Sequence, residues 1–279
     1  MHEMFQSLTL IPASFRPFFY AMATLALALF VLGTVDRMRL WTLGRDRPNT
    51  TLSGARGLRL VRLSLTKFLS RDCLLAARTF PRSRARGAML MGIVWGSLIL
   101  LVGVLFSAVA YISPVDLGNY PLSQALAFLM DLAGAALFAG LVAALARRYF
   151  FHPAKWVKVP GDGFLLVLFT WVVLLGFVTE GARLSVTGLT LALWSPVGSI
   201  IGVVLAALAG GPMAVIALYP LLYLVHAVSA LALIAYLPFS RLFHVFAAQV
   251  TTFAAREELQ RRSRRIRSPE PSAARSNME

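Results

Sequence analysis

Long uninterrupted apolar runs constrain this sequence more than any other feature. One run, FFYAMATLALALFVLGTV at 18–35, contains no charged residue. An α-helix needs about 20 apolar residues to cross about 30 Å of hydrocarbon, and a backbone inside lipid must satisfy its own hydrogen bonds, which favours helices over open strands. Several runs approach that length, and the chain is 58% hydrophobic and only 14% charged. We therefore predict an all-α integral membrane protein.

The apolar runs predict five transmembrane helices. The predicted spans are about 18–35, 88–112, 122–146, 164–179 and 213–237. We expect the last span to continue as a helix to His244 or beyond. A further apolar piece at 197–209 is too short to span comfortably, so we interpret it as a re-entrant or interfacial helix. A six-span topology, in which this piece crosses the membrane, is the alternative.

The basic residues lie between the apolar spans. In the five-span topology all 27 lysines and arginines except Arg16 and Arg183 fall on one face, and such asymmetry predicts that this face is cytoplasmic. The N-terminus is then outside and the C-terminus is inside. The six-span topology would send the basic tail outside, so five spans are favoured. The same distribution explains the net charge of +15 as a topology signal, and we expect no nucleic-acid partner.

We predict a membrane domain at 1–250 and a basic cytoplasmic tail at 251–279. The tail is polar and poor in apolar residues, so it is expected to be disordered. Within the membrane domain, a cytoplasmic loop at 36–87 mixes Leu, Val and Phe with Arg and Lys at helical spacing. This pattern is typical of a basic amphipathic helix that lies on the membrane or beneath a partner subunit. Simple anchoring to anionic membrane lipids is the other interpretation.

Ionisable residues inside the spans are costly in lipid and therefore indicate function. Asp131 lies in the third span, Glu180 and Arg183 close the fourth span, and His226 lies in the fifth. The depths and directions of these spans predict that the four residues converge in the outer half of the membrane. One interpretation is a polar pocket for a quinone head group, with a proton path to the outside. The other is structural: an interfacial Glu180–Arg183 ion pair, with Asp131 capping a neighbouring loop.

Two of the four histidines, His226 and His244, lie eighteen residues apart. In a continuous helix this spacing corresponds to about 27 Å and five whole turns, so both imidazoles would face the same side, one toward each membrane surface. Two b-type haems stacked across the bilayer would use this arrangement. A lone histidine in an apolar helix is more often a hydrogen-bonded structural residue. His2 and His152 lie outside the spans and cannot supply opposing ligands.

Several stretches, taken in order, resemble the membrane cytochrome b subunits of the respiratory nitrate reductase gamma and heterodisulfide reductase E group. The same domain is found at the N-terminus of some membrane iron–sulfur oxidoreductases. The matching stretches are spread over about 20–250: RMRLWTLGR, RGAMLMGIVWG, DLAGAALFAGLVAALARRYFFHPAKW, GFVTEGARL, WSPVG and LVHAVSALALIAYLPFSRLFH. Each stretch is weak alone, but their order, spacing and topology together make the resemblance fairly specific.

The resemblance implies a multi-pass subunit of the prokaryotic inner membrane with one or two b-type haems. It also implies electron exchange with a quinone such as menaquinone and with a cytoplasmic iron–sulfur partner. Haem ligation is carried over to His226 for the outer haem and to His244 for the inner haem. The opposing histidines of the family come from the second span, where this sequence has Leu90 and, about ten residues later, Leu100. Leucine cannot ligate iron, so the usual bis-histidine sites cannot form unchanged.

Three outcomes are open for the haem sites. Met89 or Met91 could oppose a histidine, since a thioether is a known axial ligand. A neighbouring subunit could supply a histidine instead, or this chain has lost one or both haems. We expect one haem b or none rather than two.

The predicted function is electron transfer by a membrane subunit that links the quinone pool to a cytoplasmic iron–sulfur oxidoreductase. The chain contributes no residues for substrate chemistry, and with a single cysteine, Cys73, it cannot hold a self-contained cluster. A basic inner face suits an acidic partner. The alternative function is a haem-free membrane anchor, which is favoured by Leu90 and Leu100. A transporter is disfavoured, because no inverted repeat is apparent in the sequence.

Overall fold

The computed structural model describes residues 15–43, 80–81, 83–112, 121–151, 160–187, 193–240 and 243. The helices are α2 (Phe15–Leu43), α5 (Arg84–Ile112), α6 (Pro121–Tyr149), α7 (Pro160–Thr187), α8 (Pro196–Ala209) and α9 (Pro212–Tyr236), followed by the 3₁₀ turn η2 (Leu237–Phe239). No strand occurs among these residues. The all-α prediction is therefore confirmed for the part of the chain that the structure describes.

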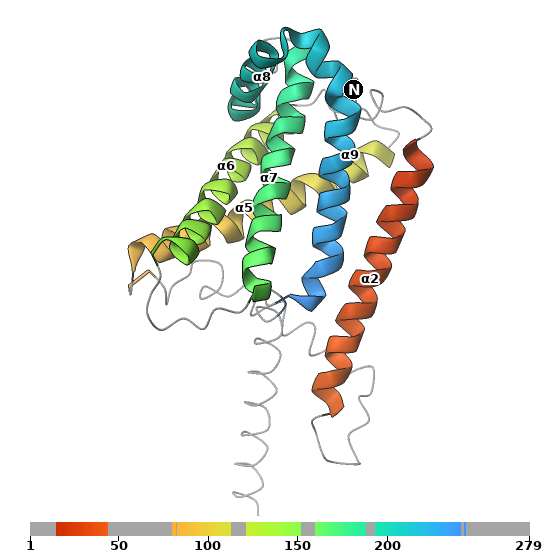
Figure 1. Cartoon of the computed structure of the whole chain (residues 1–279), viewed down its shortest axis with the longest axis vertical. Coiled ribbons are helices and arrows are strands. Elements are labelled where there is room, and N and C mark those ends of the chain that lie inside the picture. The colour runs from red at the N-terminus through yellow and green to blue at the C-terminus, as the bar shows by residue number, and fades with distance from the viewer. Residues whose placement is uncertain are drawn as a thin grey trace, which may run out of the picture.

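Five helices in the described ranges are long and apolar enough to cross a membrane, which confirms the five predicted spans. They are Pro17–Arg37, Arg84–Ser107, Gln124–Tyr149, Gly163–Ser185 and Pro212–Phe239. The helix α8 has 14 residues, so it is about 21 Å long at 1.5 Å per residue and falls short of the hydrocarbon thickness. Figure 1 shows it at one end of the molecule, beside the ends of α7 and α9.

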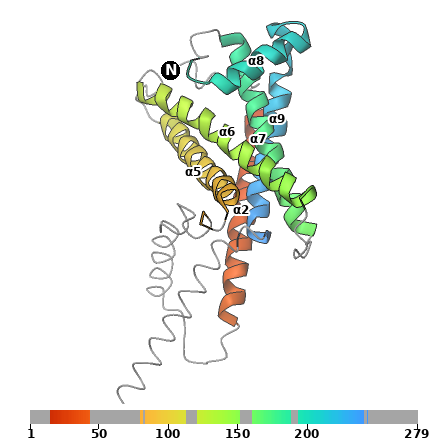
Figure 2. The same cartoon turned by 90° about the vertical axis from the view of Figure 1, so that its left-hand side faces the viewer.

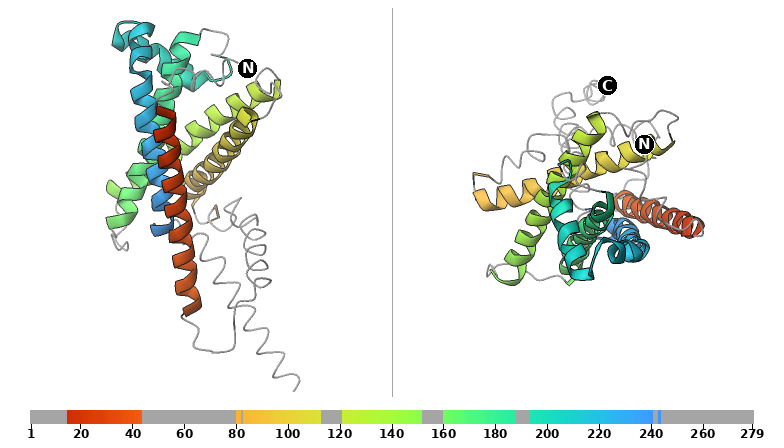
Figure 3. Two further views of the ribbon diagram at one scale, coloured as in Figure 1. Left: turned by 90° about the vertical axis from the view of Figure 1, so that its right-hand side faces the viewer. Right: turned by 90° about the horizontal axis from the view of Figure 1, so that it is seen from above.

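The spans pack against one another in the order α5, α6, α7, α9, α2. Two edges result, because α5 packs chiefly on α6 and α2 packs chiefly on α9 and η2. The pair α5 and α6 is tilted away from the direction shared by α7, α9 and α2 (Figures 2 and 3). The short helix α8 packs on α7 and also contacts α9 and α6, so it joins three of the spans at one end.

Glycines allow α5 and α6 to cross at close range. Gly92 and Gly96 form a GxxxG pattern on α5, and a methyl group on either would lie 2.7 Å from a backbone carbonyl oxygen of α6, that of Ala136 or Ala133 respectively. A methyl on Gly140 of α6 would lie 2.9 Å from the Met89 carbonyl oxygen. Small residues at such spacing let transmembrane backbones approach and gain van der Waals contact. The α5–α6 pair is therefore held by backbone packing.

A second close crossing fixes α8 against α7. A methyl group on Gly202 would lie 2.6 Å from the Gly181 carbonyl oxygen, and one on Gly181 would lie 2.9 Å from the Gly202 nitrogen. After α8 the chain turns at Gly210 and Gly211, whose φ values of 81° and 136° suit glycine because it lacks a Cβ. Pro212 then opens α9, so the position of α8 is set on both sides.

The prediction that the fifth span continues as a helix to His244 is wrong. The α-helix α9 ends at Tyr236, a 3₁₀ turn covers Leu237–Phe239, and Ser240 is extended with φ −91° and ψ 166°. Pro238 has no N–H to continue the helical ladder. Pro220 lacks it too and lies inside α9, so the end of the helix also depends on the extended backbone at Ser240. His244 therefore does not share a continuous helix with His226, and the five-turn spacing argument does not apply.

The fourth span is longer than predicted. We expected it to end at about residue 179, but α7 continues to Thr187, so Glu180 and Arg183 lie inside the helix rather than at its end. Two other predicted features, the tail at 251–279 and most of the cytoplasmic loop at 36–87, lie outside the described residues. The predictions made for them stay predictions.

Candidate functional site

Asp131 on α6 is buried and caps a different helix. Its Oδ2 accepts a hydrogen bond from the Val197 N–H at 2.8 Å, and its Oδ1 accepts one from the Gly198 N–H at 3.2 Å. These amides belong to the first turn of α8, where backbone donors lack intrahelical partners, and Ser195, the N-cap residue, makes no side-chain cap. A carboxylate at this helix end also meets the positive end of the helix dipole. The capping role that the sequence left open for Asp131 is present, and the capped segment is α8.

Glu180 and Arg183 form an ion pair on α7. The Arg183 Nη2 donates to Glu180 Oε1 at 2.6 Å, and its Nε donates to Glu180 Oε2 at 3.1 Å. The pair lies beside the same turn of α8 that Asp131 caps, because a methyl group on Gly198 would lie 3.0 Å from Glu180 Cγ. We call these residues, Asp131, Glu180, Arg183 and Gly198, the polar cluster. The structure thus brings three of the four predicted ionisable residues to one place.

His226 lies next to the polar cluster, at the interface of α9 and α7. A methyl group on Gly176 would lie 3.3 Å from its Cε1, and the imidazole also interacts with the backbone of Val172. Gly176 precedes Glu180 by four residues, so it lies one helical turn away on the same side of α7. The Nδ1 atom of His226 is buried and has no hydrogen-bond partner among the described residues. Such an atom is costly unless a ligand or water pairs with it.

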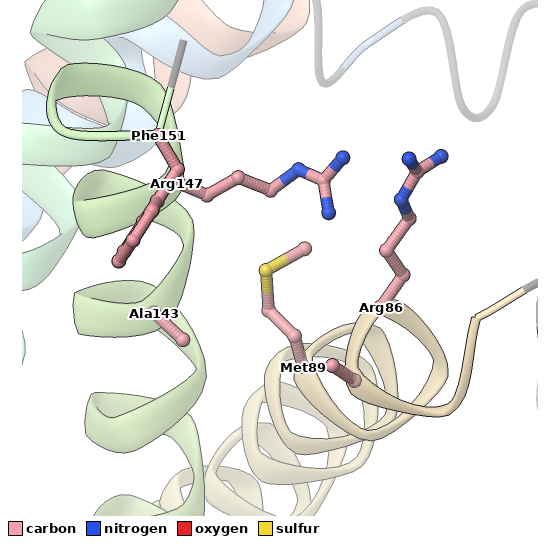
Figure 4. A pocket seen from close by; sticks show the side chains of 6 residues that line it. Arg86, Met89, Ala143, Arg147 and Phe151 are labelled. Carbon is pink, nitrogen blue, oxygen red and sulfur yellow. The ribbon is translucent and has the colours of Figure 1, made fainter. Parts of the chain in front are cut away.

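Two of the second-span residues, Met89 and Leu100, lie on the side of α5 that contacts α6. Met89 lines a pocket at the start of α5 together with Arg86, Ala143 and Arg147 (Figure 4). Leu100 packs against the buried cluster of Leu137, Leu141 and Val173. Met91 and Leu90 are half-buried on α5. Of the candidate haem ligands, His244 lies outside the described residues.

A b-type haem with two axial histidine ligands does not fit the described residues. His226 is their only histidine. The positions that the resemblance assigned to opposing histidines hold Leu90 and Leu100, and α5 packs chiefly on α6. The described residues therefore offer one axial histidine, and an opposing histidine would have to come from elsewhere in the chain or from another subunit.

Two features of the site were missed from the sequence. The first is Gly176, against which the His226 ring packs. A lone glycine in an apolar run does not indicate which side chain packs against it. The second is the amino end of α8 as the partner of Asp131, and for this feature the sequence did contain a signal. A serine directly before a proline, as in Ser195–Pro196, is a typical helix start, and such a start near Asp131 in depth could have predicted the cap.

A model of the nitrate reductase gamma subunit family matches residues 87–264. The match begins at the first turn of α5 and includes α6, α7, α8 and α9, so every described residue of the polar cluster and His226 lie within it. Comparison with curated proteins and with solved structures finds no match.

Proposed function

The chain belongs to the nitrate reductase gamma subunit family, and from this premise we propose that it links the quinone pool to a cytoplasmic iron–sulfur oxidoreductase. The family membership makes it a membrane electron-transfer subunit of a respiratory oxidoreductase complex. Beyond the family membership, we propose that its electron donor or acceptor in the membrane is a quinone, with menaquinone as the expected type, and that its partner is a cytoplasmic iron–sulfur protein.

The proposed orientation places α8 and the polar cluster at the outer surface of a prokaryotic inner membrane. The support is the charge distribution, since the ends of the spans opposite α8 carry Arg84, Arg86, Arg147 and Arg148 and basic residues concentrate on the cytoplasmic side. The N-terminus is then outside and the C-terminus is inside. The partner subunit would dock on the basic face, where opposite charge speeds association.

The buried Nδ1 of His226 is the observation that carries the proposed quinone site. A quinone or quinol head group needs hydrogen bonds at its two oxygens, and an imidazole nitrogen donates to a quinone carbonyl when it carries the proton and accepts from a quinol hydroxyl when it does not. No described residue pairs with the Nδ1 of His226. Gly176 lets the imidazole ring lie close against α7, since a methyl group there would be 3.3 Å from the His226 Cε1. Glu180, one turn beyond Gly176, and its ion-pair partner Arg183 are the ionisable groups on the proposed proton path to the outer surface. A path is needed because quinol oxidation releases two protons with its two electrons. Ionisable groups at membrane depth typically mark such relays.

Binding of a naphthoquinone to the full chain in nonionic detergent tests this site. We expect His226→Leu, which keeps the side-chain volume roughly constant, to weaken binding by about tenfold, the equivalent of one hydrogen bond to a buried group. Val225→Leu changes the neighbouring, exposed residue of α9 and is the matched control, with binding expected to stay unchanged. Equal affinity of the wild-type chain and His226→Leu would contradict a quinone site at His226.

A haem-free membrane anchor is the second candidate function. It is favoured by the leucines at 90 and 100 and by the packing of Leu100 into the α6–α7 core. Haem ligation by His226 and His244, with Met89 or Met91 opposing, stays a prediction. A pyridine haemochrome assay on the purified complex separates the two candidates. A b-type signal that belongs to this chain would exclude a haem-free anchor. A complex without haem would exclude haem ligation by His226 and His244.

A further inference from the structure

A pocket opens between the first turns of α5 and the last turns of α6, at the end of the molecule opposite α8. Its volume is about 300 Å³, and its lining residues are Ala85, Arg86, Met89, Ala143, Arg147 and Phe151. The spans Arg84–Ser107 and Gln124–Tyr149 begin and end here, so the pocket lies where two helices leave the hydrocarbon. Neither the quinone site nor the polar cluster includes any of these residues.

Two cationic groups from different helices share this pocket. Figure 4 shows the guanidinium groups of Arg86 and Arg147 extending toward the same space beside the Met89 thioether. The lining contains no carboxylate, so its charged groups are both positive. Guanidinium groups present several N–H donors in a planar fork that matches phosphate oxygens. The polar part of the pocket therefore suits a phosphate group.

The remaining lining is apolar, and its position indicates a lipid as the source of the phosphate. Ala85, Ala143 and the Met89 side chain offer a hydrocarbon wall below the two arginines. Tyr149 and Phe150 are exposed just beyond, and aromatic side chains at the end of a span are typical of the headgroup level. A free phosphate ion would gain nothing from the apolar wall, whereas the glycerol and first acyl carbons of a phospholipid would cover it.

We infer that this pocket binds the headgroup phosphate of an anionic phospholipid. Basic pockets between transmembrane helices at the inner surface bind such headgroups. An anionic headgroup is preferred over a zwitterionic one, because two guanidinium groups repel the ammonium group of a zwitterionic lipid. The bound lipid would bridge α5 to α6 at this end. The site is independent of the proposed quinone chemistry.

Competition between lipids on the full-length chain tests the inference. The chain is purified in nonionic detergent and titrated with a spin-labelled phosphatidylglycerol and, separately, with the matching phosphatidylcholine. We expect the wild-type chain to bind the phosphatidylglycerol more tightly. Each of Arg86→Gln and Arg147→Gln should weaken that preference about fivefold, as expected for the loss of one direct charge-assisted contact with the phosphate. Arg84→Gln removes an exposed arginine of the same helix turn that does not line the pocket, so it is the control and should change nothing.

A steric variant keeps the test decisive if removal of charge disturbs the fold. Ala143 is exposed on α6, so Ala143→Leu fills the pocket without burying new volume in the core and should abolish the preference while leaving both arginines in place. Inorganic phosphate at millimolar concentration should not displace the labelled lipid. Equal effects of Arg84→Gln and Arg86→Gln, an unchanged preference in Ala143→Leu, or full displacement by inorganic phosphate would each overturn the inference.

Discussion

Replacement of Asp131 by alanine tests how α8 is held across the ends of the spans. The carboxylate accepts two backbone N–H groups of α8, from Val197 at 2.8 Å and from Gly198 at 3.2 Å. Both donors belong to a helix end that has no other cap, because Ser195 makes no side-chain hydrogen bond there. The Asp131→Ala substitution leaves both amides without this acceptor.

The expected cost follows from the number and type of these bonds. Hydrogen bonds between transmembrane helices average about 0.6 kcal/mol and reach about 1.7 kcal/mol, so two of them amount to about 1–3 kcal/mol. The ionised acceptor favours the upper half of that range. Since about 1.4 kcal/mol corresponds to a factor of ten, local opening of α8 should become about one to two powers of ten more frequent.

Hydrogen exchange of the full chain in lipid nanodiscs measures this opening directly. Peptides that cover 196–205 should exchange faster in Asp131→Ala, and Asp131→Asn, which keeps one acceptor oxygen, should be intermediate. The control is Asp36→Ala, which removes an exposed carboxylate from α2 and should leave α8 unchanged. Exchange in 196–205 that stays within twofold of the wild-type rate in Asp131→Ala would refute the capping role.

Two further substitutions test the packing of the spans. Gly96→Val should lower the free energy of unfolding by about 1–3 kcal/mol through overpacking, since even a methyl there would lie 2.7 Å from the Ala133 carbonyl oxygen. The control is Ala88→Val, at an exposed position of the same helix. Equal stability of the two variants in a denaturation series would contradict the close crossing. Pro238→Ala should extend α9, because it restores the N–H that Pro238 lacks, and slow hydrogen exchange across 237–240. The control is Pro212→Ala, at a first helical position where no N–H is needed, and it should leave that exchange unchanged. Equal exchange rates across 237–240 in the two proline variants would contradict the role of Pro238 in ending α9.

The five spans could be predicted because the solvent dictates them. Lipid leaves the backbone no hydrogen-bond partner but itself, so an apolar run of sufficient length is enough to predict a helix. The ends of helices depend on single residues instead. The helix α9 ends just before Pro238, inside a string that hydropathy alone reads as continuous. The helix α7 continues past the paired Glu180 and Arg183, where the charges suggested an end.

The candidate site could be predicted only in part, because its contacts depend on how the helices cross. Similar depth in the membrane was enough to group Asp131 with Glu180 and Arg183. That Asp131 caps α8 depends on α8 lying against α7 at Gly181 and Gly202, a backbone contact that a single sequence does not reveal. The position of His226 over Gly176 likewise follows from the α7–α9 crossing. Its unpaired Nδ1 became apparent only once that crossing was known.

The measurement that tests the central claim most directly is quinol-dependent reduction of the native complex. The complex is purified through an affinity tag on this chain and mixed rapidly with a reduced menaquinone analogue, and reduction of iron–sulfur clusters is followed by electron paramagnetic resonance. We predict cluster reduction by the wild-type complex, slowed at least about tenfold in His226→Leu and unchanged in Val225→Leu. Clusters that stay oxidised in the wild-type complex, or a complex that contains no iron–sulfur protein, would contradict the proposed function.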